Sequence, residues 1–268
     1  MKTVVVTGSA RGFGLALLKE FRKYNYNVVV TDVNEEELKK AKKALEEIDS
    51  VGEILSVVCD ITDEKEINTL ISSTVRKFDS IDIWINNAGV NQAMNPVWNL
   101  DENQIDKLID IDLKGTIICS KLIMKTMIKQ GFGTIYNIEG FGSGNQKHVG
   151  LSIYGTCKRG VTYFTESLLY ECRELKTNVN VGKITPGIMI TNFINTSLGD
   201  GEKFNLDDNT KKIYNILGDY PETIAKYTVK KIMNNNKSNP KITWLNTRRV
   251  FFKFFKSIFV KNDFFSKK

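Results

Sequence analysis

The sequence predicts a single α/β domain built on a doubly wound parallel β-sheet with helices on both faces. Short runs rich in Val, Ile and Thr alternate along the chain with longer segments of helical periodicity. A glycine-rich turn follows the first of these runs directly, as in sheets that bind nucleotides at a strand-to-helix turn. The chain has 268 residues, of which 41% are hydrophobic and 26% charged, a composition typical of one globular domain.

The predicted elements follow one another without an internal repeat or a low-complexity linker. Strands are expected, in chain order, at residues 4–6, 28–30, 55–58, 81–85, 134–138 and 178–184, and helices at 15–23, 35–48 and 64–78. A stretch rich in Asn, Gly and Asp then predicts an irregular, substrate-side flap within 191–217. We therefore expect a catalytic domain over 1–240 and a C-terminal tail over 241–268.

Cysteine usage and the N-terminus favour a cytoplasmic protein. The four cysteines show neither CxxC spacing nor a disulfide pattern, and the chain passes from Met1 directly into a predicted strand, without the apolar stretch of a signal peptide. His148 is the only histidine, so no metal site is expected.

The glycine-rich turn predicts a dinucleotide site. It reads Thr7-Gly8-Ser9-Ala10-Arg11-Gly12-Phe13-Gly14 and lies between a predicted strand and a predicted helix. Gly8 permits the tight turn, Gly12 lets a pyrophosphate approach the N–H groups at the helix start, and Gly14 allows the helix to pack closely on the strand.

The residue after the second predicted strand bears on the choice of cofactor. Asp32 stands where a carboxylate accepts the ribose hydroxyls of adenosine and repels a 2′-phosphate, which favours NAD(H). Arg11 is a basic residue in the glycine turn that would meet such a phosphate, so NADP(H) stays the alternative.

Tyr154 and Lys158 are spaced to share one face of a helix. A free tyrosine has a pKa near 10, which is too high for acid–base work at neutral pH. A nearby ammonium favours the phenolate, so we expect Lys158 to lower the pKa of Tyr154 and make it a general acid or base.

Taken together, these motifs resemble the short-chain dehydrogenase/reductase family, with its Rossmann-type fold, over nearly the whole chain. The resemblance rests on the glycine turn, Asp60 and Ile61, Asn87-Ala88-Gly89 with the preceding Asn86, the Tyr154–Lys158 pair, and Pro186-Gly187 followed by Thr191. It implies that Asp60 contacts adenine, that Tyr154 exchanges a proton with the substrate oxygen, and that Lys158 holds the nicotinamide ribose. It also implies that 186–191 binds the carboxamide.

Two positions depart from the family pattern. The family's catalytic serine usually follows the strand at 134–138, but here the chain reads Glu139-Gly140-Phe141-Gly142-Ser143. Ser143 is our candidate for that role and Ser152 a weaker substitute. Asp112 stands where the family commonly has an asparagine in a proton relay, and an ionised aspartate accepts but does not donate.

The amino-acid sequence of residues 81–89 and 138–144 is similar to that of the chlorophyll(ide) b reductase branch of the family, whose members reduce a formyl group on a tetrapyrrole. This implies a large, flat, apolar carbonyl substrate for an NAD(P)-dependent oxidoreductase. The alternative is a dinucleotide-binding sensor or scaffold that has lost its chemistry, as the two departures would allow. The resemblance also implies a homodimer or homotetramer formed through helices around 101–130 and 152–175.

The predicted tail is basic and aromatic. It holds eight of the 38 Lys and Arg residues and one of the 31 acidic residues, so the body is neutral and nucleic-acid binding is not expected. On a helical wheel, six large apolar side chains between Phe251 and Phe259 share an arc of about 160°, with Arg249, Lys253 and Lys256 opposite. Residues 248–260 therefore either contact a membrane surface peripherally or pack their aromatic face on the body or on a partner subunit.

Overall fold

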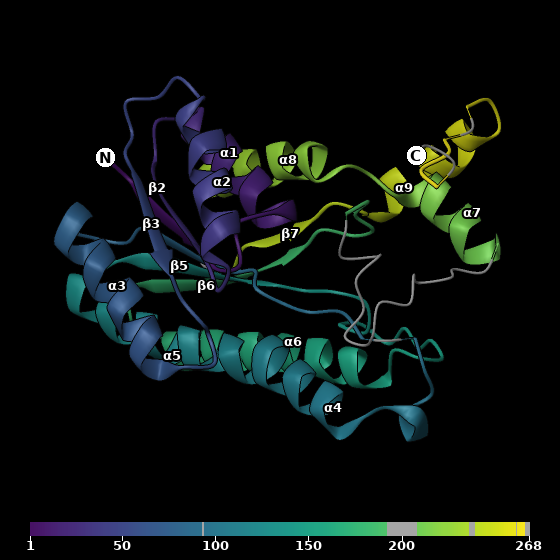
Figure 1. The fold of residues 1–268 in the computed structure, drawn as a ribbon, viewed down its shortest axis with the longest axis horizontal. Coiled ribbons are helices and arrows are strands. Elements are labelled where there is room, and N and C mark those ends of the chain that lie inside the picture. The colour runs from purple at the N-terminus through teal and green to yellow at the C-terminus, as the bar shows by residue number, and fades with distance from the viewer. Residues whose placement is uncertain (93, 192–207, 236–238, 261, 266–268) are drawn as a thin grey trace.

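The fold was analysed in a computed structural model that describes residues 1–92, 94–191, 208–235, 239–260 and 262–265. Over these residues it has a parallel sheet between two layers of helices (Figure 1). The elements are β1 (Thr3–Val6), α1 (Gly12–Arg22), β2 (Asn27–Asp32), α2 (Glu35–Glu46), β3 (Ile54–Val58), α3 (Glu64–Phe78), β4 (Ile83–Asn86), η1 (Val97–Asn99), α4 (Glu102–Leu108), η2 (Ile109–Gly115), α5 (Thr116–Gln130), β5 (Gly133–Ile138), α6 (Ser152–Glu174), β6 (Val179–Thr185), α7 (Asp208–Leu217), α8 (Pro221–Met233), β7 (Lys241–Thr243) and α9 (Thr247–Ser257).

The strands run in the order β3-β2-β1-β4-β5-β6-β7, and every pairing is parallel. The chain leaves β1 toward β2 on one side and returns to place β4 on the other, so the winding reverses between β1 and β4. Ligands of such sheets bind outside the carboxyl ends of the strands at this reversal. The doubly wound parallel sheet predicted from the sequence is therefore confirmed.

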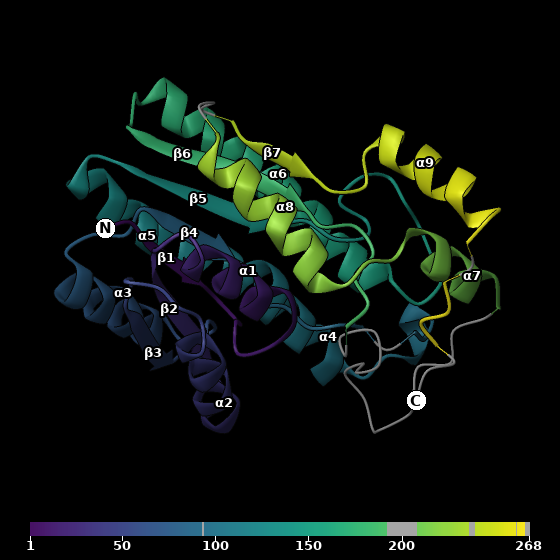
Figure 2. The same cartoon turned by 90° about the horizontal axis from the view of Figure 1, so that it is seen from above.

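Alternate residues of the strands supply two cores. In β1, Val4 and Val6 face the core under α1, α2 and α8, whereas Val5 faces the core under α3, α5 and α6. All three valines are completely buried, as expected for a parallel sheet covered on both faces. Figures 1 and 2 show the two helix layers and the carboxyl ends of the strands pointing together toward α7 and α9.

The structure corrects one predicted boundary. β7 pairs with the end of β6 directly after residue 240, and Trp244 is buried in the core behind it. The body of the fold therefore continues into the predicted tail. Of the predicted flap, 208–217 forms α7, while 192–207 lie outside the described residues.

The tail forms the helix α9, whose basic side faces the body. The Arg249 guanidinium lies 3.7 Å from the ring centroid of Trp244 and 4.7 Å from that of Tyr227, and Lys253 Nζ lies 2.7 Å from Asp219 Oδ2. Of the arrangements expected for residues 248–260, packing of the aromatic face on the body is therefore not the one this structure has, and contact with a membrane or with a partner subunit stays a prediction. None of the helices among the described residues combines the length and apolarity needed to cross a membrane.

Candidate active site

The glycine turn leaves an open stretch of backbone at the start of α1. Gly8 and Gly12 both have φ of +58°, a conformation that favours glycine. A Cβ built on Gly8 would lie 2.7 Å from the Cα of Ala88, so this position is closed by packing. A Cβ built on Gly12 would meet nothing within 4 Å, so a ligand can reach the backbone there. This exposed helix N-terminus fits the pyrophosphate of a dinucleotide.

The loop after β4 holds the glycine turn in place. Thr7 Oγ1 accepts hydrogen bonds from the backbone N–H groups of Asn87 and Ala88, both at 3.0 Å. The Asn87 amide donates to the carbonyls of Thr7 and Gly8 at 2.9 Å. The side chains of Thr7 and Asn87 therefore shape the turn, in addition to the cofactor contact that the family resemblance implies for Asn87.

Several predicted cofactor residues already use their side chains within the protein. Ser9 Oγ is buried and accepts a hydrogen bond from Thr31 N–H at 3.1 Å. Asp60 Oδ1 accepts from the N–H and the hydroxyl of Thr62, both at 2.8 Å. Asp32, at the end of β2, is half-buried, and one of its oxygens accepts from Asn34 N–H at 3.3 Å. Asp32 therefore lies at the same edge of the sheet as the open helix start, while Arg11 is exposed there.

Tyr154 and Lys158 lie one turn apart on α6, and both side chains are buried. Lys158 Nζ lies 5.4 Å from the centroid of the Tyr154 ring. The backbone N–H of Tyr154 donates to Oε1 of the fully buried Gln92 at 2.9 Å, which fixes the start of the helix. The sequence prediction that the two side chains come together is borne out in this geometry.

Asp112 joins this pair through an unusual turn of helix. It lies in η2, a π-helical segment between α4 and α5, and its side chain is fully buried. Oδ2 forms an ion pair with Lys158 Nζ at 2.9 Å, and Oδ1 accepts from Val90 N–H at 2.7 Å. Single π-helical turns within helices often mark functional sites. A buried carboxylate and ammonium thus neutralise each other directly beside the phenol.

The pKa of Tyr154 is raised in this structure, whereas the sequence predicts that it is lowered. Burial is the largest influence on Tyr154; Lys158 opposes it and the Asp112 carboxylate adds to it, and together they raise the pKa of Tyr154 to about 12. Burial also opposes the ammonium of Lys158, but Asp112 and Tyr154 together raise the pKa of that lysine. The influence of Lys158 on Tyr154 has the predicted sign. It is outweighed, because the phenol is removed from water and Asp112 balances the lysine charge.

Ser143 is buried but is engaged with the backbone. Its Oγ accepts from Gly140 N–H at 3.1 Å and donates to the Lys158 carbonyl at 3.3 Å. The residue beside the Tyr154 hydroxyl is instead Gly140, since a Cβ built there would lie 2.4 Å from Tyr154 Oη. Ser152 is exposed at the start of α6. A substrate contact by Ser143 stays a prediction. In this structure its hydroxyl connects the loop after β5 to α6 through these two hydrogen bonds.

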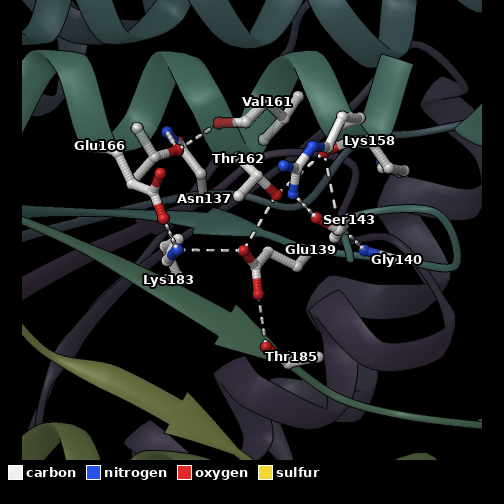
Figure 3. Close-up of polar contacts among 12 residues, drawn as sticks. Asn137, Glu139, Gly140, Ser143, Lys158, Val161, Thr162, Glu166, Lys183 and Thr185 are labelled. Atoms are coloured by element: carbon white, nitrogen blue, oxygen red, sulfur yellow. Dashed lines mark hydrogen bonds and ion pairs between the residues drawn. The ribbon is translucent and has the colours of Figure 1, made fainter. Parts of the chain in front are cut away.

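Glu139 is a buried carboxylate that sequence reasoning did not assign (Figure 3). Its oxygens accept from the hydroxyls of Thr162 on α6 at 3.0 Å and Thr185 on β6 at 2.6 Å. Lys183 Nζ lies 3.4 Å from Glu139 and 2.6 Å from Glu166. Glu139 therefore connects α6, which carries Tyr154 and Lys158, to the strand end that precedes Pro186. Its position directly after a buried strand was the only signal in the sequence.

The segment after β6 lies against the region that leads to α9. Gly187 has φ of +74°, and a Cβ built on it would lie 2.7 Å from Leu245 Cδ1. Met189 then forms a parallel bridge with Asp219. Thr191 is half-buried just before the segment outside the described residues. The predicted carboxamide-binding residues Pro186, Gly187 and Thr191 therefore reach the carboxyl edge of the sheet.

The part of the chain that the structure describes holds neither a metal-binding cluster nor an exposed thiol. No group of three His, Cys, Asp or Glu side chains that could hold a metal ion occurs there. The four cysteines are buried and unpaired, and burial raises the pKa of Cys157, the one nearest the site, to about 11. These thiols are therefore poor nucleophiles at neutral pH.

Comparison with known proteins gives consistent matches. Residues 2–201 match the family described as short chain dehydrogenase. The probable chlorophyll(ide) b reductase NYC1, chloroplastic, of Arabidopsis thaliana is 30% identical over 267 residues, covering 93% of this chain and 51% of its own length. Levodione reductase of Leifsonia aquatica is 28% identical over 201 residues, covering 74% of this chain and 73% of its own. The chain spans about half the length of the plant relative.

Solved structures agree on the fold. A crystal structure of levodione reductase has a TM-score of 0.78 at 22% identity and covers 92% of this chain and 97% of its own. NAD⁺-bound xylitol dehydrogenase has a TM-score of 0.77 at 23% identity, covering 91% and 97%. Serine dehydrogenase complexed with NADP⁺ has a TM-score of 0.77 at 24% identity, covering 92% and 95%. The last two structures contain different dinucleotides, NAD⁺ in the first and NADP⁺ in the second.

Proposed function

Because the chain belongs to the short-chain dehydrogenase family of oxidoreductases, we propose that it transfers a hydride between NAD(H) and a carbonyl or alcohol at Tyr154 and Lys158. The observation that carries this proposal is the buried Tyr154 hydroxyl, with Gly140 beside it and Lys158 one turn away. The open backbone at Gly12 supports a bound dinucleotide at the same edge of the sheet.

In the direction of reduction, the nicotinamide, when bound, supplies the hydride to the carbonyl carbon. Tyr154 donates its proton to the carbonyl oxygen, so the C=O double bond becomes a C–O single bond with one new C–H and one new O–H bond. Lys158 stabilises the resulting phenolate, which takes a proton back from water. Asp112 holds Lys158 in reach of the phenol through the ion pair at 2.9 Å.

We propose NAD(H) over NADP(H) because Asp32 ends β2 with an accessible carboxylate. Titrating the purified protein with NADH and with NADPH, followed by nicotinamide fluorescence, tests this. We expect tighter binding of NADH, and Asp32→Ala should remove the preference, whereas Asp49→Ala, which alters an exposed acid beyond α2, should not. A preference of the unaltered protein for NADPH would refute the assignment of Asp32.

The substrate that we propose is a large, flat, apolar carbonyl compound. Support comes from the plant relatives, whose names describe reduction of chlorophyll(ide) b. A screen of apolar aldehydes and ketones, including a formyl tetrapyrrole, should give NADH oxidation that falls about 100-fold or more in Tyr154→Phe. Turnover of small polar carbonyls alone would refute the substrate class.

A sensor or scaffold is the second candidate. It is favoured by the Asp112–Lys158 ion pair and by the pKa of about 12 at Tyr154, both of which hold the phenol in its neutral form. Under this alternative, NADH binds but no carbonyl oxidises it, and Tyr154→Phe matches the wild type in every assay. Any NADH oxidation that depends on Tyr154 refutes the sensor.

We also propose a homodimer or homotetramer through α4, α5 and α6. Tyr163 and Tyr170 on α6 are 73% and 64% exposed in the single chain, which supports an interface on this helix. A monomeric mass in light scattering at micromolar concentration would refute it. The cytoplasmic location stays a prediction from the sequence, whereas the names of the plant relatives describe chloroplastic proteins.

A further inference from the structure

We propose that α9 is a docking surface for an anionic lipid bilayer, which it contacts through its phenylalanine face while lying parallel to the membrane. This aromatic face consists of Phe251, Phe252, Phe254 and Phe255 of α9 together with Ile258 and Phe259 of the turn that follows it. Phe251 is 76% exposed, Ile258 72% and Phe259 74%, so the face is uncovered in the single chain. Large aromatic and aliphatic side chains on one side of a basic helix are typical of helices that lie in a membrane interface.

The body of the protein fixes this face outward. Arg249 is stacked against Trp244 and Tyr227, and Lys253 Nζ lies 2.7 Å from Asp219 Oδ2 and 3.0 Å from the Gly218 carbonyl. Both cations lie on the side of the helix opposite Phe251. To bury the aromatic face on the body, the helix would have to roll over and break these contacts. The exposure is therefore built into the way α9 is attached.

The charges beside the aromatic face favour lipid over a second copy of the chain. Arg248 and Lys256 are exposed at the two ends of α9 and, among the described residues, have no acidic partner. On the wheel Arg248 falls within the aromatic arc, at the first turn of the helix, and Lys256 lies about 40° outside it, so both long side chains can extend to lipid phosphates. Two copies meeting through this face would bring their cations together. An anionic bilayer offers both the apolar layer and the opposite charge.

The position of α9 would place the candidate active site close to a bilayer, so that a substrate could pass from the membrane to the site. Figures 1 and 2 show α7 and α9 at the end of the molecule toward which the strands point, where the candidate active site lies. α9 packs against α7, and Tyr214 of α7 lies close enough to Tyr154 to contribute to its raised pKa. A protein docked through α9 would thus hold its active site beside the bilayer, where an apolar substrate dissolves.

Flotation with vesicles tests the proposal without any need for turnover, so its failure would leave the proposed reaction untouched. We expect the full chain to float with phosphatidylcholine vesicles containing phosphatidylglycerol, and to bind vesicles of phosphatidylcholine alone more weakly. Phe251→Ser with Phe255→Ser should weaken binding by about tenfold or more. The matched control is Phe132→Ser, which changes an exposed phenylalanine just before β5, at the opposite edge of the sheet, and should bind as the wild type does.

A second pair of variants tests the charge. Lys256→Gln should weaken binding to the anionic vesicles by about fivefold, while Lys43→Gln, at an exposed lysine of α2, should not. An unchanged melting temperature in each variant shows that it folds. Equal flotation of the double phenylalanine variant and the wild type would overturn the proposal. The proposal would also be overturned if the wild type did not bind anionic vesicles and the double phenylalanine variant had a lower mass than the wild type in light scattering. That result would assign the aromatic face to contact with a second copy of the chain.

Discussion

Replacing Asp112 by asparagine tests whether the buried carboxylate stabilises the charged Lys158. The exposed fractions of the two side chains are 0% and 8%, and the Nζ–Oδ2 distance is 2.9 Å. Asparagine keeps the volume and an oxygen that accepts from Val90 N–H, but it turns an amide donor toward the ammonium. Removing one partner of a buried ion pair costs about 3–5 kcal/mol, so we expect the free energy of unfolding to fall by about 3 kcal/mol.

The assay is urea unfolding at pH 7 of the wild type, the two single variants and the double variant. Lys158→Met removes the ammonium that Asp112→Asn leaves without a partner, so the double variant should lose less stability than the two singles added together. We expect a coupling free energy of about 2 kcal/mol, seen as a shift of the midpoint with an unchanged m-value. Losses that add to within about 0.5 kcal/mol would refute the reasoning, because the two charges would then not depend on each other.

Three further outcomes follow from the site. Gly140→Ala places a Cβ 2.4 Å from Tyr154 Oη and should displace the phenol. Steady-state kinetics should show a kcat lowered about tenfold with little change in the KM for NADH. A kcat within about twofold of the wild-type value would contradict this. Glu139→Leu removes the buried acceptor of the Thr185 hydroxyl and leaves Lys183 with Glu166 alone, so it should cost about 3 kcal/mol in denaturant unfolding. Glu139→Gln keeps an acceptor oxygen and should cost less. A loss below about 1 kcal/mol in Glu139→Leu would contradict a stabilising role for Glu139. The pKa of Tyr154 is raised from 10 to about 12, so the folded state holds this proton more tightly than the unfolded state does. The resulting stability is present below pH 10 and is lost between pH 10 and about 12. Tyr154→Phe should therefore lose less stability than the wild type over that interval, and an identical loss would show that another group titrates there.

The features that the sequence predicts well are those encoded in short stretches. The glycine turn, the following helix and the Tyr154–Lys158 spacing each lie within one or two turns of chain, and the structure places them as expected. The order of the sheet follows from the alternation of strand and helix patterns together with the glycine turn. Local pattern therefore supplied most of the architecture and located the edge at which the site lies.

The features that it could not predict depend on contacts between distant parts of the chain. Glu139 and Thr185 are 46 positions apart, and only the pairing of β5 with β6 brings them together. The net direction of the Tyr154 pKa depends on burial, which the spacing of Lys158 does not reveal. The amphipathic pattern of α9 was visible in the sequence, but which side faces the body is decided by Asp219, whose contact with Lys253 is a tertiary one.

The three-residue strand β7 has a consequence for the solubility of the protein. A strand at the border of a sheet exposes unpaired N–H and C=O groups, and other chains can add to it. β7 covers the longer β6, and it is itself short, preceded by Pro240 and begun by the exposed Lys241. Short length, proline and lysine are each known to discourage such edge-to-edge pairing. Cutting the chain at residue 240 would uncover β6 and would therefore promote aggregation, even though the residues of the candidate active site would all remain.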